Sequence, residues 1–236
     1  MIRAVFFDWS NTIARYIPKR EELQSQALQD FGISISPNEI APGIAIADRY
    51  LIEEGAASPL RLRSPAEQAK IYTRYEQMVF NKVGVSMPAN SDNFPKFMKR
   101  LDELYKRLRF VLYDDVLPSL KTLKEQKLIL ALVTNVDADM SSICREVGLE
   151  LYLDFIVTSG EVGASKPHPK IFLTALERAR VTASEAAHVG DQYDIDVIGA
   201  MSVGIKPILL DRLDLFPDVR DCPRIHSLSE LPQYLK

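Results

Sequence analysis

The sequence predicts an α/β protein, with a doubly wound parallel sheet and a helical domain inserted after the first strand. Short, continuous apolar runs recur along the chain, as expected for strands that are buried on both faces of a parallel sheet. Amphipathic helical segments separate most of these runs. A long stretch after the first run shows helical patterns and no convincing strand.

The strand candidates are residues 4–7, 128–133, 155–157, 187–189 and 208–210. Between them, apolar side chains recur at helical spacing on two segments, and Gly148 and Gly204 are well placed to end helices. Because strand and helix alternate, right-handed crossovers are expected to join parallel strands. The apolar helical positions are Met140, Ile143, Cys144 and Val147 in one segment, and Ile171, Phe172, Ala175, Leu176 and Ala179 in the other.

The inserted segment is predicted to be a second, small domain that spans residues 16–112. The α/β core is then made of residues 1–15 and 113–236. Ser64, Pro65 and Glu67 supply an N-cap, a proline at the first helical position and a capping-box partner, and they mark one helix start clearly. The helices expected in the insert are residues 21–31, 43–54, 65–82 and 92–110.

The composition of the chain argues against several classes of protein. The chain has 236 residues, 47% of them apolar, and a net charge of −3, which argues against a surface built to bind nucleic acid or an anionic membrane. The two cysteines, Cys144 and Cys222, are too few for a disulfide framework and lack zinc-site spacing. With no signal peptide pattern and no apolar span long enough to cross a bilayer, we expect a cytoplasmic protein.

Polar residues gather where the apolar runs end. Ligands of open α/β sheets bind beyond the carboxyl ends of the strands, so these residues are the candidates for a functional site. They are Asp8, Ser10, Asn11 and Thr12 after the first run, Thr134 and Asn135 after the second, Lys166 in the loop after the third, and Gly190, Asp191, Asp194 and Asp196 after the fourth.

These side chains form a set suited to phosphoryl transfer. Asp8 and Asp191 could share a Mg²⁺ ion, which prefers hard oxygen ligands. Lys166 could neutralise charge on a phosphoryl group, while Thr134 and the backbone amides around Asn11 donate hydrogen bonds to its oxygens. Asp8 could then attack phosphorus and form an aspartyl-phosphate.

The chain resembles the haloacid dehalogenase superfamily of hydrolases, with a helical cap after the first strand. The resemblance covers residues 1–15 and 113–236 and rests on four spaced motifs, which are D-W-S-N-T at residues 8–12, T-N at 134–135, K-P at 166–167, and G-D at 190–191 followed by Asp196. It implies that Asp8 is the nucleophile and a Mg²⁺ ligand together with the Ser10 carbonyl and Asp191. It also implies that Thr134, Lys166, Asn11, Thr12 and Asn135 bind the substrate, and that Asp196 and Asp194 support the site.

Ser10 departs from the pattern of the phosphatases in this superfamily. Most of them carry an aspartic acid there, which protonates the leaving alkoxide and later activates water. A serine hydroxyl is too weak for either task, and general acid–base catalysis is typically worth about 10²- to 10⁴-fold. Asn11 replaces a common glycine, and asparagine tolerates the positive φ that this turn requires.

We therefore predict a Mg²⁺-dependent hydrolase that acts on a small phosphorylated metabolite and is slow on alkyl phosphates. Alternative functions are a phosphonatase-like C–P hydrolase, a haloacid dehalogenase, or a catalytically weak protein that binds a phosphorylated ligand. Retention of Gly190 and Asp191 counts against dehalogenation. No nucleic acid or membrane partner is expected, and the chain is expected to be a monomer or a homodimer.

Overall fold

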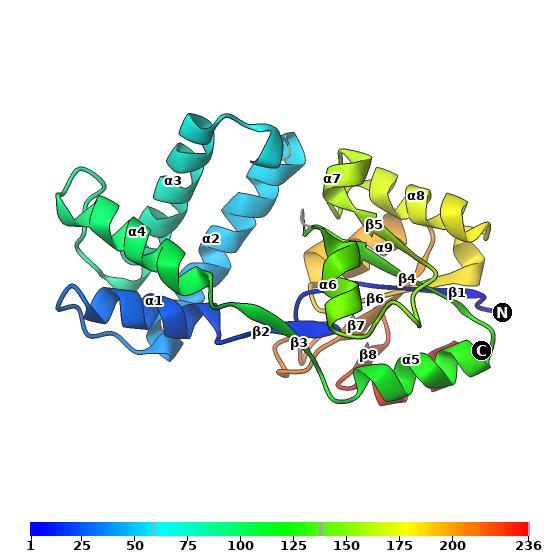
Figure 1. Ribbon diagram of the computed structural model, residues 1–236. Helices are drawn as coiled ribbons and strands as arrows, with labels where there is room; N and C mark the ends of the chain where they lie inside the picture. The colour runs from blue at the N-terminus through cyan, green and yellow to red at the C-terminus, as the bar shows by residue number, and fades with distance from the viewer. Residues whose placement is uncertain (59, 137–138, 236) are drawn as a thin grey trace. The chain divides into compact units, whose positions relative to one another are not determined.

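The computed structural model describes residues 1–58, 60–136 and 139–235 (Figure 1). The chain divides into two compact units. One consists of Met1–Arg15 and Val111–Lys236 and is called the α/β unit below, and the other consists of Tyr16–Phe110 and is called the helical unit. The chain passes from one unit to the other within the short strands β2 (Ala14–Ile17) and β3 (Arg109–Leu112).

The α/β unit is built on a six-stranded sheet in the order β5-β4-β1-β6-β7-β8. Each pair of neighbouring strands is parallel. The predicted fold class is confirmed, and each of the five predicted strands lies in this sheet. The strands are β1 (Ala4–Phe7), β4 (Ile129–Thr134), β5 (Phe155–Thr158), β6 (Ala186–Gly190), β7 (Lys206–Leu210) and β8 (Arg224–Ile225).

The strand order changes direction at β1. From β1 the chain builds the sheet outward through β4 and β5, and it then returns to the other side of β1 to add β6, β7 and β8. In open α/β sheets the crevice at such a switch point holds the ligand. Phe7 lies opposite Leu132 of β4 and Val189 of β6, so the residues that follow these three strands meet at one edge.

Helices cover both faces of the sheet, with α5 and α8 on opposite sides (Figure 1). Ile171, Phe172 and Ala175 of α8 are buried against Phe6 of β1 and Val133 of β4. Because all four residues of β1 are buried, its apolar run carries no alternation. The helices of this unit are α5 (Val116–Glu125), α6 (Met140–Glu146), α7 (Ser159–Val162), α8 (Pro169–Ala179) and α9 (Ile198–Ser202), with 3₁₀ turns at Ala183–Glu185 and Leu228–Tyr234.

The helical unit packs its helices around its own core, in which Leu28, Ile40, Val79, Phe80 and Phe97 are almost fully buried. The aromatic rings of Phe80 and Phe97 meet edge to face, with centroids 5.0 Å apart. Such pairs stabilise a core slightly beyond the area they bury. The helices are α1 (Arg20–Gln29), α2 (Pro37–Ala57), α3 (Pro65–Val83) and α4 (Asn93–Tyr105), with a 3₁₀ turn at Leu60–Leu62.

Two details of the insert differ from the sequence prediction. Residues 109–112, whose first part was assigned to a helix, form β3, which pairs with β2 in a two-stranded sheet. The rings of Tyr16 and Phe110 lie 4.5 Å apart, so the pairing is supported by side chains that are far apart in sequence.

Helix α2 begins at Pro37 rather than at residue 43 and continues through Pro42. Ser36 caps it, accepting a hydrogen bond from the Glu39 amide, and Glu39 bonds back to the Ser36 amide at 2.9 Å. This is the same capping box that marks the start of α3, and it stabilises the first turn despite the proline that follows. Across residues 1–58, 60–136 and 139–235, no helix has the length and apolarity to cross a bilayer.

Candidate functional site

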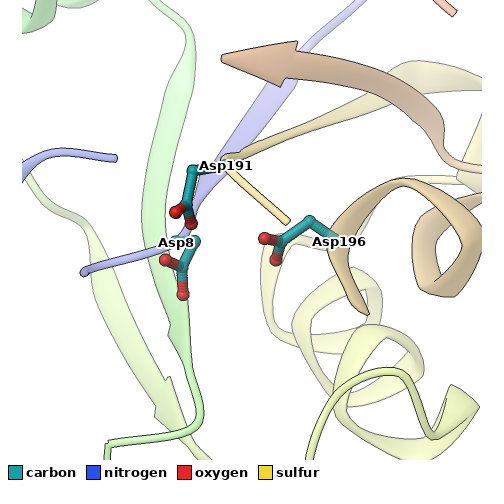
Figure 2. A group of neighbouring side chains, drawn as sticks. All are labelled: Asp8, Asp191 and Asp196. Atoms are coloured by element: carbon teal, nitrogen blue, oxygen red, sulfur yellow. The ribbon is translucent and has the colours of Figure 1, made fainter. Parts of the chain in front are cut away.

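Three carboxylates converge at the carboxyl end of the sheet, where the switch point predicts a ligand. Asp8 follows β1, Asp191 follows β6, and Asp196 lies in the π-helical turn Tyr193–Val197. One oxygen from each lies within 4.8 Å of an oxygen of the other two. Figure 2 shows the carboxyl groups of Asp8 and Asp191 facing the same space, with that of Asp196 turned toward them.

Lys166 is the cation of this cluster. Its Nζ lies 2.6 Å from Asp8 Oδ1 and 2.7 Å from Asp196 Oδ1, and its side chain is 1% exposed. Asp196 is fully engaged, because His188 Nε2 also lies 3.0 Å from Oδ1 and the Gln192 amide donates to Oδ2 at 3.1 Å. Asp196 therefore holds Lys166 in place. Asp8 makes fewer of these side-chain contacts than Asp196 does.

Gly190 makes this geometry possible. A Cβ atom at this position would lie 2.1 Å from Asp196 Cγ and 2.3 Å from its Oδ2, which is far inside van der Waals contact. The backbone of β6 thus approaches the Asp196 carboxylate closely, and only glycine permits that approach. In the motif Gly190-Asp191, the glycine leaves room for the Asp196 side chain, and the aspartate supplies a carboxylate to the cluster.

Burial and charge shift the acidity of these groups. Burial raises the pKa of Asp8, and burial together with the Asp8 and Asp196 charges raises the pKa of Asp191 well above its usual value. Burial acts in the same direction on Asp196, but Lys166 and His188 outweigh it and lower the pKa of Asp196. Although burial opposes its charge, the two carboxylates raise the pKa of Lys166 to about 12.

The cluster fits a divalent cation. Asp8 Oδ2 and Asp191 Oδ1 are buried, and neither has a hydrogen-bond partner in the part of the chain that the structure describes. A buried carboxylate oxygen without a partner is costly, so a ligand is expected there. When all three carboxyl groups are ionised, they and the ammonium of Lys166 sum to two negative charges. Hard oxygen ligands with excess negative charge suit Mg²⁺.

The turn after β1 lies beside the cluster. Asn11 adopts the predicted positive φ, at +55°, and its side chain opposes a small part of the rise that burial causes in the pKa of Asp191. Ser10 is half-buried and bridges to Ala14, while Thr12 is fully buried, so that its hydroxyl faces the protein interior. Burial of Thr12 does not suit the substrate contact expected for its side chain.

Of the other predicted residues, Thr134 and Asn135 make contacts at the end of β4, whereas Asp194 lies outside the carboxylate cluster. Thr134 is buried at the end of β4, and its Oγ1 accepts a hydrogen bond from the Val136 amide at 3.0 Å. Asn135 hydrogen-bonds the backbone of Lys166. Asp194, in contrast, is exposed and does not belong to the carboxylate cluster.

Two contacts around the cluster were not predicted from the sequence. His188 lies in the run 187–189, which was predicted to be a buried strand; it is buried, and its ring also bonds Asp196. Arg212 donates to the Thr12 carbonyl from Nε and Nη2, at 3.2 and 2.9 Å, and pairs through both Nη atoms with Asp115 at 3.0 Å. It thereby ties the turn after Asp8 to the start of α5. No sequence motif marks this arginine.

Comparison with known proteins finds relatives of this chain. A sequence model of the family described as "Hydrolase: haloacid dehalogenase-like hydrolase" matches residues 2–204. A zebrafish (Danio rerio) protein, haloacid dehalogenase-like hydrolase domain-containing protein 3, is 30% identical over 243 aligned positions, which cover 100% of this chain and 97% of that protein.

Two further relatives carry names of different activities. Glyceraldehyde 3-phosphate phosphatase from Methanopyrus kandleri is 28% identical over 90% of this chain and 85% of its own length. The crystal structure of a 2-haloacid dehalogenase from Pseudomonas syringae is 28% identical, with a TM-score of 0.59, and the match covers 100% of this chain and 98% of that one.

Proposed function

We propose that this chain, which belongs to the haloacid dehalogenase-like hydrolase family, is a Mg²⁺-dependent phosphohydrolase that acts on a small phosphorylated metabolite. The observation that carries the proposal is the pair of buried oxygens on Asp8 and Asp191 that have no hydrogen-bond partner among the described residues, next to the ammonium of Lys166. Asp8 and Asp191 would hold the ion. When bound, Mg²⁺ would offset negative charge on the phosphoryl oxygens.

The chemistry of the chain follows from the positions of its side chains. The Asp8 carboxylate attacks phosphorus, a bond forms between its oxygen and phosphorus, and the ester P–O bond breaks. Lys166, 2.6 Å from Asp8 Oδ1, offsets the charge that the transferred group brings. Water then attacks phosphorus, which releases phosphate and restores the Asp8 carboxylate.

Proton transfer to the leaving group is the step to which this site is least suited. The alkoxide that leaves must take a proton, and the hydroxyl of Ser10, two residues after Asp8, is a poor acid. We therefore expect slow turnover of alkyl phosphates and faster turnover of aryl phosphates, whose leaving groups need no proton. The helical unit, Tyr16–Phe110, is proposed to act as a cap domain that selects the substrate.

The direct test is hydrolysis of p-nitrophenyl phosphate with and without Mg²⁺. Activity should require Mg²⁺ and fall by roughly 10⁴-fold or more in Asp8→Ala, because the nucleophile is lost. Alanine is preferred to asparagine because it cannot revert to aspartate by deamidation. Full activity in Asp8→Ala would remove the proposed mechanism.

A second variant tests the role of Ser10. Ser10→Asp restores a carboxylic acid two residues after Asp8, and it should raise kcat for an alkyl phosphate such as glycerol phosphate by roughly 10²- to 10⁴-fold. The aryl phosphate should respond much less, because its leaving group is already good. An equal response of both substrates would show that proton transfer to the leaving group is not the missing function.

Dehalogenation is the second candidate, favoured by the similarity to the Pseudomonas syringae 2-haloacid dehalogenase and by the absence of an acid at Ser10. The Asp8 carboxylate would attack carbon and release a halide, with no need for a cation. Chloride release from 2-chloropropionate in the presence of EDTA separates the two reactions. Such release, without phosphatase activity in Mg²⁺, would replace our proposal with this one.

A further inference from the structure

Asn135 makes an unusual contact with the lysine of the site. It directly follows β4, whereas Lys166 lies in the loop between α7 and α8. The Asn135 Nδ2–H donates to the Lys166 carbonyl at 2.9 Å, and the Lys166 N–H donates to Asn135 Oδ1 at 2.7 Å. One carboxamide therefore pairs with both backbone polar groups of a single residue, as a neighbouring β-strand would.

Asn135 is itself held in place. Its carbonyl accepts a hydrogen bond from the hydroxyl of Ser159 at 3.1 Å, and Ser159 is 7% exposed. The preceding residue, Thr134, is buried and bonds the amide of Val136. The carboxamide thus projects from an ordered strand end, and it connects the loop of Lys166 to the sheet.

This connection matters because lysine is a flexible side chain. Its four-carbon stem loses considerable rotamer freedom when the ammonium is fixed. The Lys166 Nζ is nevertheless held within 2.7 Å of both Asp8 and Asp196. A backbone shift at Lys166 would lengthen both contacts, and shifts of about 1 Å at catalytic groups are costly.

We propose that Asn135 is a positioning residue for Lys166 rather than a contact for the substrate. Its carboxamide fixes the Lys166 backbone, which keeps the ammonium between Asp8 and Asp196 at the reaction centre. Both polar atoms of the Asn135 side chain are used for this purpose. The inference revises the substrate-binding role expected for Asn135, and its catalytic consequence rests on the proposed phosphohydrolase function.

A double-mutant cycle separates positioning from direct substrate contact. Asn135→Ala should lower kcat for p-nitrophenyl phosphate by about 10- to 100-fold, the usual loss when a residue that orients a catalytic group is removed. In a Lys166→Met background, measured in single turnover at high enzyme concentration, Asn135→Ala should cause no further loss. Equal fold-losses in both backgrounds would overturn the proposal, because Asn135 would then act independently of Lys166.

A second measurement does not depend on activity and also covers the case in which Lys166→Met does not fold. Lys166 is 1% exposed, so an amine-acetylating reagent should leave it unmodified in the wild type, as read by peptide mass spectrometry. In Asn135→Ala its acetylation should rise by about tenfold or more, because the loop opens more often.

Gln77→Ala is the matched control. It removes a comparable contact, the 2.9 Å bond from Gln77 Nε2 to the Met87 carbonyl, in the helical unit. It should leave the acetylation of Lys166 unchanged. Unchanged acetylation in Asn135→Ala would contradict the inference even if activity fell. If the wild type hydrolyses no phosphate ester, the proposed function fails, and the acetylation result still decides whether Asn135 positions Lys166.

Discussion

The α/β unit and the helical unit each bury carboxyl groups, and they stabilise them in different ways. In the α/β unit, Asp8 and Asp196 face the ammonium of Lys166. In the helical unit, Glu76 is 3% exposed, and it receives two hydrogen bonds from Gln24 Nε2, at 3.1 and 2.9 Å. An amide carries no charge, so Gln24 offsets the burial of a negative charge on Glu76 less than Lys166 does for Asp8 and Asp196.

The acidities reflect this difference. Burial raises the pKa of Glu76 to about 8, against smaller opposing effects of Gln24 and Arg20. Lys166 and His188 lower the pKa of Asp196 despite its complete burial. A buried carboxyl group therefore does not by itself indicate a functional site. What distinguishes the α/β cluster is a buried cation beside carboxylate oxygens that have no hydrogen-bond partner within the described parts of the chain.

The largest expected effect concerns the buried cation. Lys166→Met keeps the length of the side chain but leaves Asp8 and Asp196 without their positive partner. Removing one member of a buried ion pair typically costs about 3–5 kcal/mol, so the free energy of unfolding should fall by that amount in Mg²⁺-free buffer. Urea denaturation measures it. A loss below about 1 kcal/mol would mean that the carboxylates do not need the lysine.

The second prediction concerns the buried acid of the helical unit. Glu76 has a raised pKa, so between its unfolded value near 4.5 and its folded value near 8 the folded chain binds a proton that the unfolded chain has lost. Its contribution to stability is complete at low pH and is lost as the pH rises through this window, by up to about 1.4 kcal/mol per pH unit.

Glu76→Gln removes this titration while preserving the size of the side chain. The difference in the free energy of unfolding between the variant and the wild type should shift in favour of the variant by up to about 4 kcal/mol between about pH 5 and pH 8. Denaturant titrations at several pH values give this difference. A difference that does not change with pH would show that Glu76 is not protonated in the folded chain.

The third prediction compares one substitution in the two units. Gly190→Ala places a Cβ 2.1 Å from Asp196 Cγ, so the cluster must shift, and overpacking of this kind costs about 1–3 kcal/mol. In Gly55→Ala, the new Cβ in α2 meets no described atom within 4 Å apart from its own turn of helix, and the substitution should stabilise the helix by up to about 1 kcal/mol. Thermal unfolding compares them, and equal effects would contradict the close approach at Gly190.

Much of the α/β unit was predictable because short, local sequence patterns mark its strands and the residues that follow them. Residues 4–7 form a continuous apolar run and lie in a strand that is buried on both faces, and the polar residues after such strands must meet at the carboxyl edge of a parallel sheet. The convergence of Asp8, Lys166 and Asp191 needed no knowledge of side-chain geometry. The clustering of the site residues was therefore the stronger part of the prediction.

The errors arose where the fold depends on distant contacts or on a misread local signal. The pairing of β2 with β3 joins segments that are far apart in the sequence, and neither strand is a continuous apolar run. The second helix was expected to begin at residue 43, directly after Pro42, although the capping box at Ser36 and Glu39 marks the true start of α2. The contacts of His188 and Arg212 depend on tertiary geometry that no spacing rule encodes.

The most direct test of the account is isothermal titration calorimetry of the chain with Mg²⁺ and no substrate. If Asp8 Oδ2 and Asp191 Oδ1 hold the ion, the wild type should bind about one Mg²⁺, as a single site predicts. Asp191→Asn should weaken binding by at least about tenfold, and Asp218→Asn, which alters an exposed carboxylate elsewhere in the same unit, should not change it. Equal Mg²⁺ affinity in the wild type and Asp191→Asn would contradict the proposed cation site.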